Sequence, residues 1–294
     1  MTNTFAELRR KGIGGSDVAA IAGLNPWKTP LQVWKEKVLG DTVEENAAMS
    51  WGTKLEPLVL DTYAQQTGAT LRKRDTVLAD GWRMANVDAE AVLNDQTYVV
   101  EAKTARTDKG WGQAYSDDVP DHYACQGQWY CDVLGLDRVD FAVLIAGSDF
   151  RIYSQRKIPA VVNQLRALAD KFWHENVLKE IPPDPVTAAE ANDLWRKSTG
   201  RSVTLPEDVV IAINNRQIFK ERIAELEKEM ETCELALKRA MQDADTAVDA
   251  TGKTVATWKT QVARRLDTAR LKAQYSSIYE ECCNQTESRV LRVK

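Results

Sequence analysis

The stretch Asn86–Arg106, NVDAEAVLNDQTYVVEAKTAR, decides the fold because it reads as two strands folded back on each other. Apolar and polar residues alternate on both sides of Asn94-Asp95, and this period of two is typical of strands buried on one face. Asn and Asp also tolerate the backbone conformations that a turn needs. The pairs that face each other on the apolar side are then Val87 with Ala102, Ala89 with Val100, and Ala91 with Tyr98.

The other face of this hairpin carries charge. The same register places Asp88 opposite Glu101, with Lys103 two residues further along. Directly opposed carboxylates repel each other unless a cation lies between them. Lys103 supplies part of that charge, and Mg²⁺ or Mn²⁺ is the stronger candidate because both ions prefer oxygen ligands. Taken alone, a solvated hairpin face with a surface Glu-x-Lys pair remains the simpler interpretation.

Composition indicates a globular protein of one large or two modest domains. The chain has 294 residues, of which 44% are hydrophobic and 28% are charged. No apolar run approaches the ~20 residues that span a bilayer, and the N-terminal residues lack the apolar core of a secretory signal. Five cysteines without a C-x-x-C pair indicate reduced thiols in a cytosol and argue against zinc or iron–sulfur ligation. The net charge of -4 does not exclude nucleic-acid binding, which needs only a local basic surface.

The segment Arg9–Asp17, RRKGIGGSD, is a basic, glycine-rich approach to a short helix over residues 18–22. Ser16 or Asp17 is the expected N-cap. The N–H groups of a helix start preceded by Gly14 and Gly15 suit a phosphate, and a nearby arginine adds charge-assisted bonds. A capped helix with a solvated basic lead-in is the alternative interpretation.

The next segments predict a sheet flanked by helices. The spacing of apolar residues predicts a helix ending at Gly68, in which Pro57 must occupy the first turn or cause a kink. Glu56 lies near its start, either as an exposed carboxylate or as a third acid pointing at the hairpin. A helix over HYACQGQWYCDVLG puts Tyr123, Gln126 and Tyr130 on one face. Strands over 139–146 and 150–157 and a helix over 159–178 complete a mixed sheet of the α/β or α+β class.

The proline cluster IPPDP, residues 181–185, is the expected domain boundary, which gives domains of residues 1–182 and 183–294. Residues 206–243 predict one long charged helix, followed by a hairpin that turns at Gly252 and by a short basic tail. The apolar seam of this helix needs a partner in its own subunit or in a neighbouring one. Its residues are Ile218, Ile223, Leu226, Met230, Cys233 and Leu237.

Four motifs occur in the order seen in phage recombination exonucleases: RRKGIGGSDVAAIAGLNPWKTP, SWGTKLEP, the hairpin with Asp88 and Glu101-Ala102-Lys103, and HYACQGQWY. Residues 5–180 resemble the YqaJ-type viral recombinase family, which is related to lambda exonuclease and built on a restriction-endonuclease-like core. The resemblance implies a Mg²⁺-dependent 5′→3′ exonuclease that resects linear double-stranded DNA to 3′ overhangs for phage recombination. It also implies that the substrate is a DNA end with a 5′-phosphate and that a single-strand annealing protein is a partner. The implied assembly is a homotrimeric ring, and the implied location is the cytoplasm of a bacterial host.

The resemblance also implies roles for single residues. Asp88, Glu101 and the carbonyl of Ala102 correspond to metal ligands, and Lys103 to the lysine that acts on water or stabilises the phosphorane. Glu56 matches the helix acid near the metal, and Tyr123 with Gln126 match a pair beside the catalytic centre. Arg9 and Ser16 align with residues that hold the terminal 5′-phosphate, together with the Gly14-Gly15 turn. The sequence departs from the lambda-type pattern at Asn86-Val87 and at Ala89, where proline and glycine often stand.

Two other functions stay open. One is a related endonuclease or RecB-like repair nuclease, including forms with an iron–sulfur cluster, against which the missing cysteine cluster argues. The other is a non-catalytic module that binds DNA ends or a partner through the long C-terminal helix. The complete set of Asp88, Glu101 and Lys103 argues against that module, because a silent protein has no need of opposed carboxylates.

Overall fold

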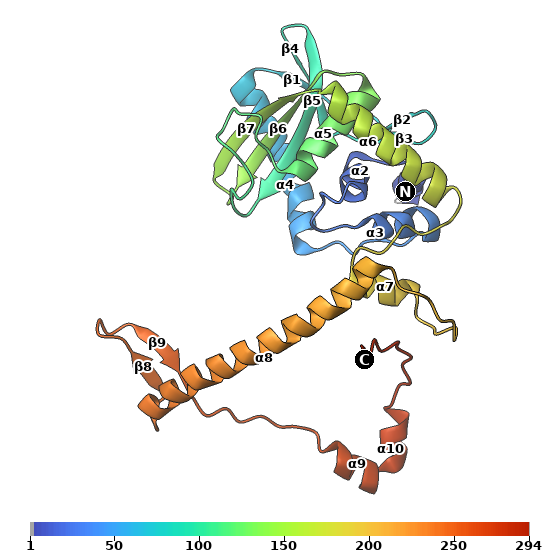
Figure 1. Ribbon diagram of the computed structural model, residues 1–294. Coiled ribbons are helices and arrows are strands. Elements are labelled where there is room, and N and C mark those ends of the chain that lie inside the picture. Colours follow the sequence, from blue (N-terminus) through green and yellow to red (C-terminus); the bar gives the residue numbers. More distant parts are fainter. Residues whose placement is uncertain (1–2, 294) are drawn as a thin grey trace. The chain divides into compact units, whose positions relative to one another are not determined.

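The computed structural model describes residues 3–293 and divides into two compact units, residues 1–194 and 195–294. No helix in the described part of the chain combines the length and the apolar character that a membrane crossing needs. The first unit holds a central sheet with helices on both faces (Figure 1). The second unit is dominated by one long helix.

The sheet of the first unit has five strands in the order β1-β4-β5-β6-β7. Its central strand, β5, pairs in parallel with β6, whereas the other neighbours pair antiparallel. The mixed sheet flanked by helices that the sequence predicted is therefore confirmed. The strands are β1 (Thr70–Arg72), β4 (Ala89–Leu93), β5 (Gln96–Ala105), β6 (Arg138–Ile145) and β7 (Asp149–Arg156).

The predicted hairpin register is confirmed within the strands, because Ala89 pairs with Val100 and Ala91 with Tyr98. Asn94 and Asp95 form the turn with φ of 51° and 61°, the left-handed conformation that a two-residue hairpin turn requires. The predicted partnership of Val87 with Ala102 is wrong. β4 starts only at Ala89, and Val87 packs in the core on the opposite side of the sheet from Ala102.

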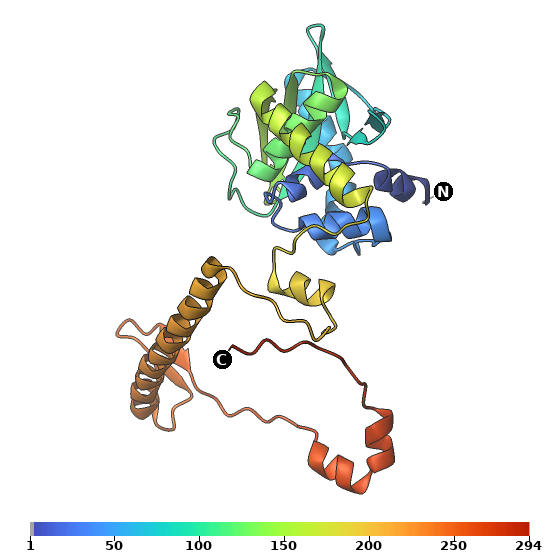
Figure 2. The same cartoon turned by 45° about the vertical axis from the view of Figure 1, so that its right-hand side comes forward.

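Both faces of the sheet are covered, so the alternative interpretation of the hairpin as carrying a solvated face is wrong (Figure 2). α4 (Ala47–Thr67) packs on one face through Val59 and Tyr63. The elements whose buried residues belong to the core on the other face are α2 (Gly15–Ile21), α3 (Pro30–Trp34), α5 (Asp121–Leu134), α6 (Pro159–Lys171) and η2 (Phe172–Val177). The remaining elements of this unit are α1 (Asn3–Arg10), η1 (Lys35–Leu39), the hairpin of β2 (Val77–Ala79) with β3 (Arg83–Ala85), and α7 (Ala188–Leu194).

α4 begins earlier than the sequence indicated. Asn46 caps it by accepting a hydrogen bond from the Met49 N–H at 3.0 Å, so Pro57 lies in the helix interior and not in the first turn. Tyr63, one turn and a half further on, is fully buried and donates to Asp140 at 2.5 Å, while Arg138 pairs with the same carboxylate at 2.6 Å. These bonds fix α4 over β6, because a buried carboxylate must keep its partners.

The first unit ends later than the proline cluster suggested. α7 is held to it by contacts of Glu190 with Thr29 and of Asp193 with Lys35, so the two compact units divide after Leu194 and not after residue 182. The second unit contains the predicted long helix and the predicted hairpin, with Gly252 at φ 85° in the turn. Its elements are α8 (Glu207–Met241), β8 (Thr246–Val248), β9 (Thr254–Thr257), α9 (Thr268–Gln274) and α10 (Ser276–Glu281).

Two helical glycines give opposite expectations for substitution by alanine. A Cβ at Gly127 of α5 would lie 2.7 Å from Val139 and 2.8 Å from Phe141 of β6, so Gly127→Ala should destabilise the fold by about 1–3 kcal/mol. Gly52 of α4 has only Thr104 within reach at 3.8 Å, so Gly52→Ala should be neutral or stabilising by up to about 1 kcal/mol. Urea unfolding of both variants measures the contrast, and equal effects would contradict the packing of α5 on β6.

Candidate active site

Asp88 and Glu101 form the centre of the candidate site. Asp88 stands just before β4, where its backbone leaves the ladder, and its carboxylate accepts a hydrogen bond from the Ala102 N–H at 2.8 Å. The Asp88 N–H in turn donates to Glu101 Oε1 at 3.3 Å. Glu101 lies in the central strand and is only 1% exposed. The two acids are thus opposed as predicted, but they are joined through the backbone, and Glu101 is removed from water whereas Asp88 is only partly buried.

Lys103 supplies the positive charge nearest to this pair. Its Nζ lies 2.7 Å from Glu101 Oε2 and 5.3 Å from the centre of the Tyr123 ring. Burial alone would lower the pKa of Lys103, but the charges of Glu101 and Asp88 outweigh it and raise that pKa above its usual value. The Lys103 ammonium therefore stays protonated in this arrangement, so it acts as a fixed cation and not as a free base.

One further predicted acid, Glu56, and one predicted aromatic residue, Tyr123, lie in the electrostatic surroundings of the pair. Burial and the charge of Asp88 raise the pKa of Glu101 to about 7, although Lys103 opposes the shift. Burial, and then the charge of Asp88, also raises the pKa of Glu56, which places this residue of α4 within electrostatic reach of the site. The pKa of Tyr123 is raised, chiefly by burial. Glu56 and Tyr123 thus belong to the same charged environment as Asp88, Glu101 and Lys103.

α5 connects the carboxylate pair to the N-terminal segment. Gln126 donates from Nε2 to Glu101 at 3.2 Å and to the Tyr130 hydroxyl at 3.0 Å, since residues four apart share a helix face. A Cβ on Gly15 would lie 2.8 Å from Gln126 and 2.9 Å from Tyr130, so only glycine lets α2 approach α5 this closely. Tyr130 was expected on this face, but its place between the two sites was not.

A small pocket of about 160 Å³ opens beside Tyr130. The predicted residues Arg9, Gly14, Gly15 and Ser16 all line it, so the structure does bring them together. The predicted N-cap is wrong, however: Gly14 caps α2, and Asp17 is the third helical residue. Asp17 accepts a hydrogen bond from the Gly14 N–H at 3.1 Å, which turns the glycine loop back onto its own helix.

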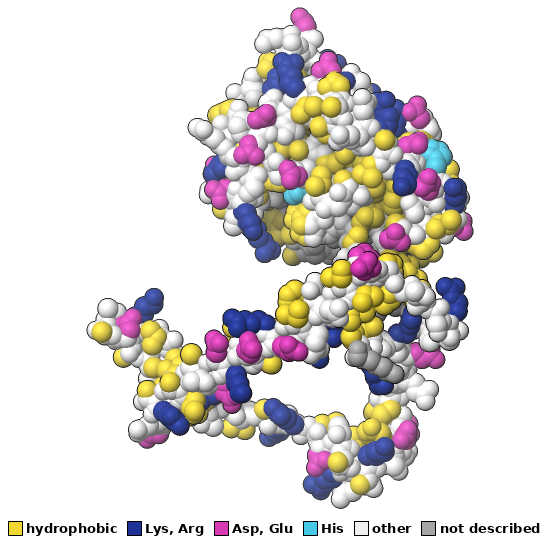
Figure 3. Space-filling model, viewed as in Figure 1, with side chains coloured by type: hydrophobic (Ala, Val, Ile, Leu, Met, Phe, Trp, Pro, Cys, Tyr) yellow, Lys and Arg dark blue, Asp and Glu magenta, His cyan; other side chains and the backbone are white. Residues whose placement is uncertain are grey.

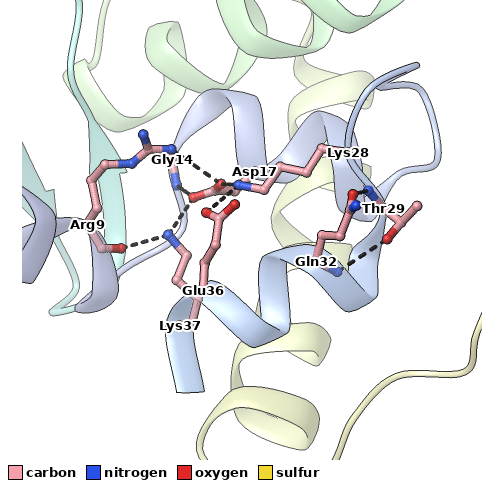
Figure 4. Close-up of polar contacts among 8 residues, drawn as sticks. All are labelled: Arg9, Gly14, Asp17, Lys28, Thr29, Gln32, Glu36 and Lys37. Carbon is pink, nitrogen blue, oxygen red and sulfur yellow. Dashed lines mark hydrogen bonds and ion pairs between the residues drawn. The ribbon is translucent and has the colours of Figure 1, made fainter. Parts of the chain in front are cut away.

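Asp17 also lies at the centre of an ion cluster that sequence reasoning missed (Figure 4). Its carboxylate is 2.6 Å from Lys37 Nζ, 2.8 Å from Lys28 Nζ and 3.9 Å from the Arg9 guanidinium. Burial alone would raise the pKa of Asp17, but these three cations hold it well below its usual range. Lys37 also donates to the Arg9 carbonyl at 2.7 Å, so the cluster ties α1 to α2 and η1.

The small pocket adjoins a groove of about 800 Å³, because Arg9 and Ser16 line both. Lysine and arginine predominate among the charged residues of the groove. On its rim stands Trp27, 72% exposed, with its ring edge-on to His122 at 5.1 Å. His122 precedes Tyr123 on α5, so aromatic groups extend from the groove to Lys103. An exposed tryptophan in the loop after α2 was the only sequence signal for this rim.

The donor atoms at the carboxylate pair fit a hard divalent cation. Asp88, Glu101 and the Ala102 carbonyl offer oxygen ligands, the type that Mg²⁺ and Mn²⁺ prefer. Within residues 3–293 no group of three or more His, Cys, Asp or Glu side chains is placed to hold a metal, so two carboxylates would act with backbone oxygen and water. Burial is the main cause of the raised pKa of Glu101, and the charge of Asp88 adds to it, so a bound cation would favour the ionised carboxylate.

The titration of Glu101 should make stability depend on pH in metal-free protein. The folded chain holds the Glu101 proton up to about pH 7, whereas the unfolded chain releases it near 4.5, so the unfolded state binds fewer protons in this window. Stability should therefore fall by roughly 1–3 kcal/mol as pH rises through it. Urea unfolding with chelator at pH 5 and pH 8 measures the fall, which Glu101→Gln should remove. The control is Glu90→Gln, which changes a strand carboxylate paired with Arg74 and should leave the fall in stability unchanged. If the fall persists in Glu101→Gln, it does not come from the titration of Glu101.

Comparison with known proteins places the chain in a family. Residues 4–137 match the YqaJ-like viral recombinase domain. The uncharacterized protein YqaJ of Bacillus subtilis (strain 168) is 30% identical over 300 aligned positions, which span 97% of this chain and 92% of that protein. The alkaline exonuclease LHK-Exo of Laribacter hongkongensis, solved with dAMP, is 18% identical with a TM-score of 0.48 and covers 62% of this chain and 94% of its own. A phage-related exonuclease of Haemophilus somnus 129PT is 13% identical with a TM-score of 0.43, covering 60% and 99%. The match to YqaJ along nearly its whole length shows that the chain belongs to the YqaJ-like viral recombinase family.

Proposed function

We propose that this protein is a metal-dependent 5′→3′ exonuclease that resects linear double-stranded DNA. One observation carries the proposal: Gln126 and Tyr130 connect the buried Glu101, with its neighbours Asp88 and Lys103, to a pocket that contains Arg9 and Ser16. A reactive centre beside a separate anion pocket is what an enzyme needs to hold a chain end by its phosphate and cut the next bond. Membership of a viral recombinase family supports a DNA substrate.

Asp88, Glu101 and the Ala102 carbonyl would hold the metal, with Mg²⁺ as the expected ion and Mn²⁺ as a substitute. When bound, such an ion neutralises charge on the phosphoryl oxygens and lowers the pKa of a bound water. The chain's own part is to hold both carboxylates in place, and the bound ion would favour the ionised form of Glu101. Ala102 N–H fixes Asp88 at 2.8 Å, and Lys103 with Gln126 fixes Glu101 at 2.7 and 3.2 Å.

Lys103 would stabilise the transition state. Its ammonium is held protonated by Glu101 and Asp88, and it borders the site on the side of Tyr123. A fixed cation at this place favours the extra negative charge that develops on the phosphoryl group during hydrolysis.

Arg9 and Ser16 would hold the terminal 5′-phosphate. Among the described residues the guanidinium makes a long contact of 3.9 Å to Asp17, and its side chain is 45% exposed, so it is available for a ligand. A phosphate held there would set digestion in the 5′→3′ direction and leave a 3′ overhang for a single-strand annealing protein in phage recombination. A closed homotrimer around the duplex, in the cytoplasm of the host, is the assembly that agrees with a net charge of only -4.

Loss of either carboxylate should abolish hydrolysis while the fold persists. Asp88→Asn or Glu101→Gln removes a charge that holds the cation, so nucleotide release from linear duplex with Mg²⁺ should fall by at least about 10²–10³-fold. Glu90→Gln, on the neighbouring strand, should retain activity. Wild-type rates in both carboxylate variants, at unchanged circular dichroism, would exclude this site as the reactive centre.

The end preference should depend on Arg9 and not on its neighbour. Duplex with 5′-phosphate should be digested faster than duplex with 5′-hydroxyl, and Arg9→Ala should erase that difference because the charge in the pocket is lost. Arg10 instead donates to the Lys37 and Val38 carbonyls at 3.3 and 3.2 Å, so Arg10→Ala should keep the preference. Parallel time courses on both ends measure the ratio; a ratio retained in Arg9→Ala would leave the pocket without this role.

A further inference from the structure

α8 exposes a large apolar surface along its whole length. It has 35 residues, about 50 Å, and the only buried side chain on it is that of Met241 at its last residue. Within the described part of the second unit, neither α9 nor α10 lies along it in either view (Figures 1 and 2). Figure 3 shows hydrophobic side chains exposed on α8 beside a row of acidic ones. A helix of this kind gains most of its stability from a partner.

One set of apolar residues on α8, interrupted by Arg216, follows the spacing of a coiled coil, whereas Val210, Ile211, Ile218 and Leu235 lie off it. Successive residues of this set are three or four positions apart in alternation. They therefore occupy the first (a) and fourth (d) positions of a seven-residue repeat, which form one stripe along the helix. Phe219, and not Ile218, keeps this spacing. The a positions are Val209, Arg216, Ile223, Met230 and Leu237, and the d positions are Ala212, Phe219, Leu226, Cys233 and Ala240. Ile223, Leu226 and Met230 are 54%, 47% and 59% exposed, so the middle of the stripe is open to a second helix.

The charges beside this stripe identify the partner. Lys220 and Arg222 flank its first half, whereas Glu227, Glu229 and Glu234 flank its second half. Two parallel copies in register would pair Arg222 with Glu227 but also Glu229 with Glu234, so attraction and repulsion would cancel. Two antiparallel copies with full overlap place each basic half against the acidic half of the other copy.

We propose that α8 pairs antiparallel with α8 of a second copy of this chain. In this register Lys220 meets Glu227 of the other copy, Arg222 meets Glu229, and no like charges oppose each other. The seam then stacks Ile223 on Leu226, Phe219 on Met230, and Ala212 on Leu237. If the two helices shifted by one heptad, Glu227 would face Glu227 of the other copy and Glu229 would face Glu229. This repulsion means that the charges select one register. Arg222 also pairs with Glu225 in its own helix at 3.0 Å, but both side chains are mostly exposed, so this contact is weak.

This pairing is independent of the nuclease site and of how the first unit assembles. An antiparallel pair of identical helices has two-fold symmetry. If the first unit is monomeric, the pair joins two chains; if the first unit forms a ring, the pairs join two rings. In both cases the assembly has twice the mass that it would have without α8 pairing. Any variant that breaks α8 pairing should therefore halve the mass measured by light scattering while nuclease activity persists. The proposed exonuclease can fail its own tests without affecting this result.

The first experiment compares two leucines of equal exposure. Leu226 lies in the seam and Leu235 on the opposite side of the helix, and both are 47% exposed. Leu226→Lys should halve the mass of the full-length protein, and Leu235→Lys should leave it unchanged. Circular dichroism confirms that both variants fold. An unchanged mass in Leu226→Lys, or equal loss in both, would overturn the proposal.

Charge exchange tests the register. Lys220→Glu with Arg222→Glu should weaken association at least tenfold, because four acidic pairs then oppose each other, and Glu227→Lys with Glu229→Lys should weaken it likewise. The variant with all four changes should associate like the wild type, since every pair is restored with reversed sign. Failure of the fourfold variant to recover would mean that the charges meet some other surface.

Cysteine cross-linking tests the direction. Parallel copies would bring Cys233 against Cys233, whereas the antiparallel register brings it against Arg216. With the exposed Cys282 and Cys283 changed to serine, mild oxidation should leave the chain unlinked. Adding Arg216→Cys should give a covalent dimer on a non-reducing gel, since the two positions are far apart within one helix. A dimer linked through Cys233 alone, or none with Arg216→Cys, would refute antiparallel pairing.

Discussion

The buried carboxylate of Glu101 in the middle of the central strand is the constraint on which the rest of the first unit depends. A charge in this position must be compensated, because water is excluded from both faces of the sheet. Lys103, Gln126 and the Asp88 N–H provide that compensation at 2.7, 3.2 and 3.3 Å. Each partner comes from a different place in the chain, so satisfying one carboxylate fixes β5, α5 and the entry to β4 together.

A second buried carboxylate, Asp17, orders the N-terminal segment in the same way. Here three cations surround Asp17, and Glu36 pairs with one of them, Lys28, so cations outnumber acids; around Glu101 the balance is reversed, because two acids share one lysine. The excess of positive charge lies beside the pocket of Arg9 and Ser16, and the excess of negative charge lies on β4 and β5. An anion and a cation are therefore each favoured at their own site, and α5 separates the two.

The sequence predicted the elements better than the ends of those elements. The period of two between Ala89 and Val100 defines the register because the turn at Asn94 leaves only one way to bury both apolar faces. The same alternation wrongly predicted that Val87 pairs with Ala102. The alternation of apolar and polar residues does not show that the Asp88 carboxylate accepts a hydrogen bond from the Ala102 N–H, which ends the ladder before Val87. Likewise, composition around Pro57 could not show that Asn46 would cap α4 eleven residues earlier.

The candidate site was predicted as single residues but not as a connected network. Asp88, Glu101 and Lys103 are close in sequence, and a register suffices to bring them together. Asp17 with Lys37, and Gln126 with Glu101, are joined only through tertiary packing, which leaves no local pattern to detect. The groove beside Trp27 has the same origin, because its lining comes from segments that meet only in the folded unit.

The contact between Gly15 and α5 sets the distance between helices α2 and α5. Because no Cβ fits between Gly15 and Gln126, the spacing of these two helices is set by bare backbone against side chain. The span from the anion pocket to the carboxylates is consequently a constant of the fold, independent of any mobile loop. Any group that binds beside Gly15 would therefore lie at a set distance from Glu101, whatever its own length or flexibility.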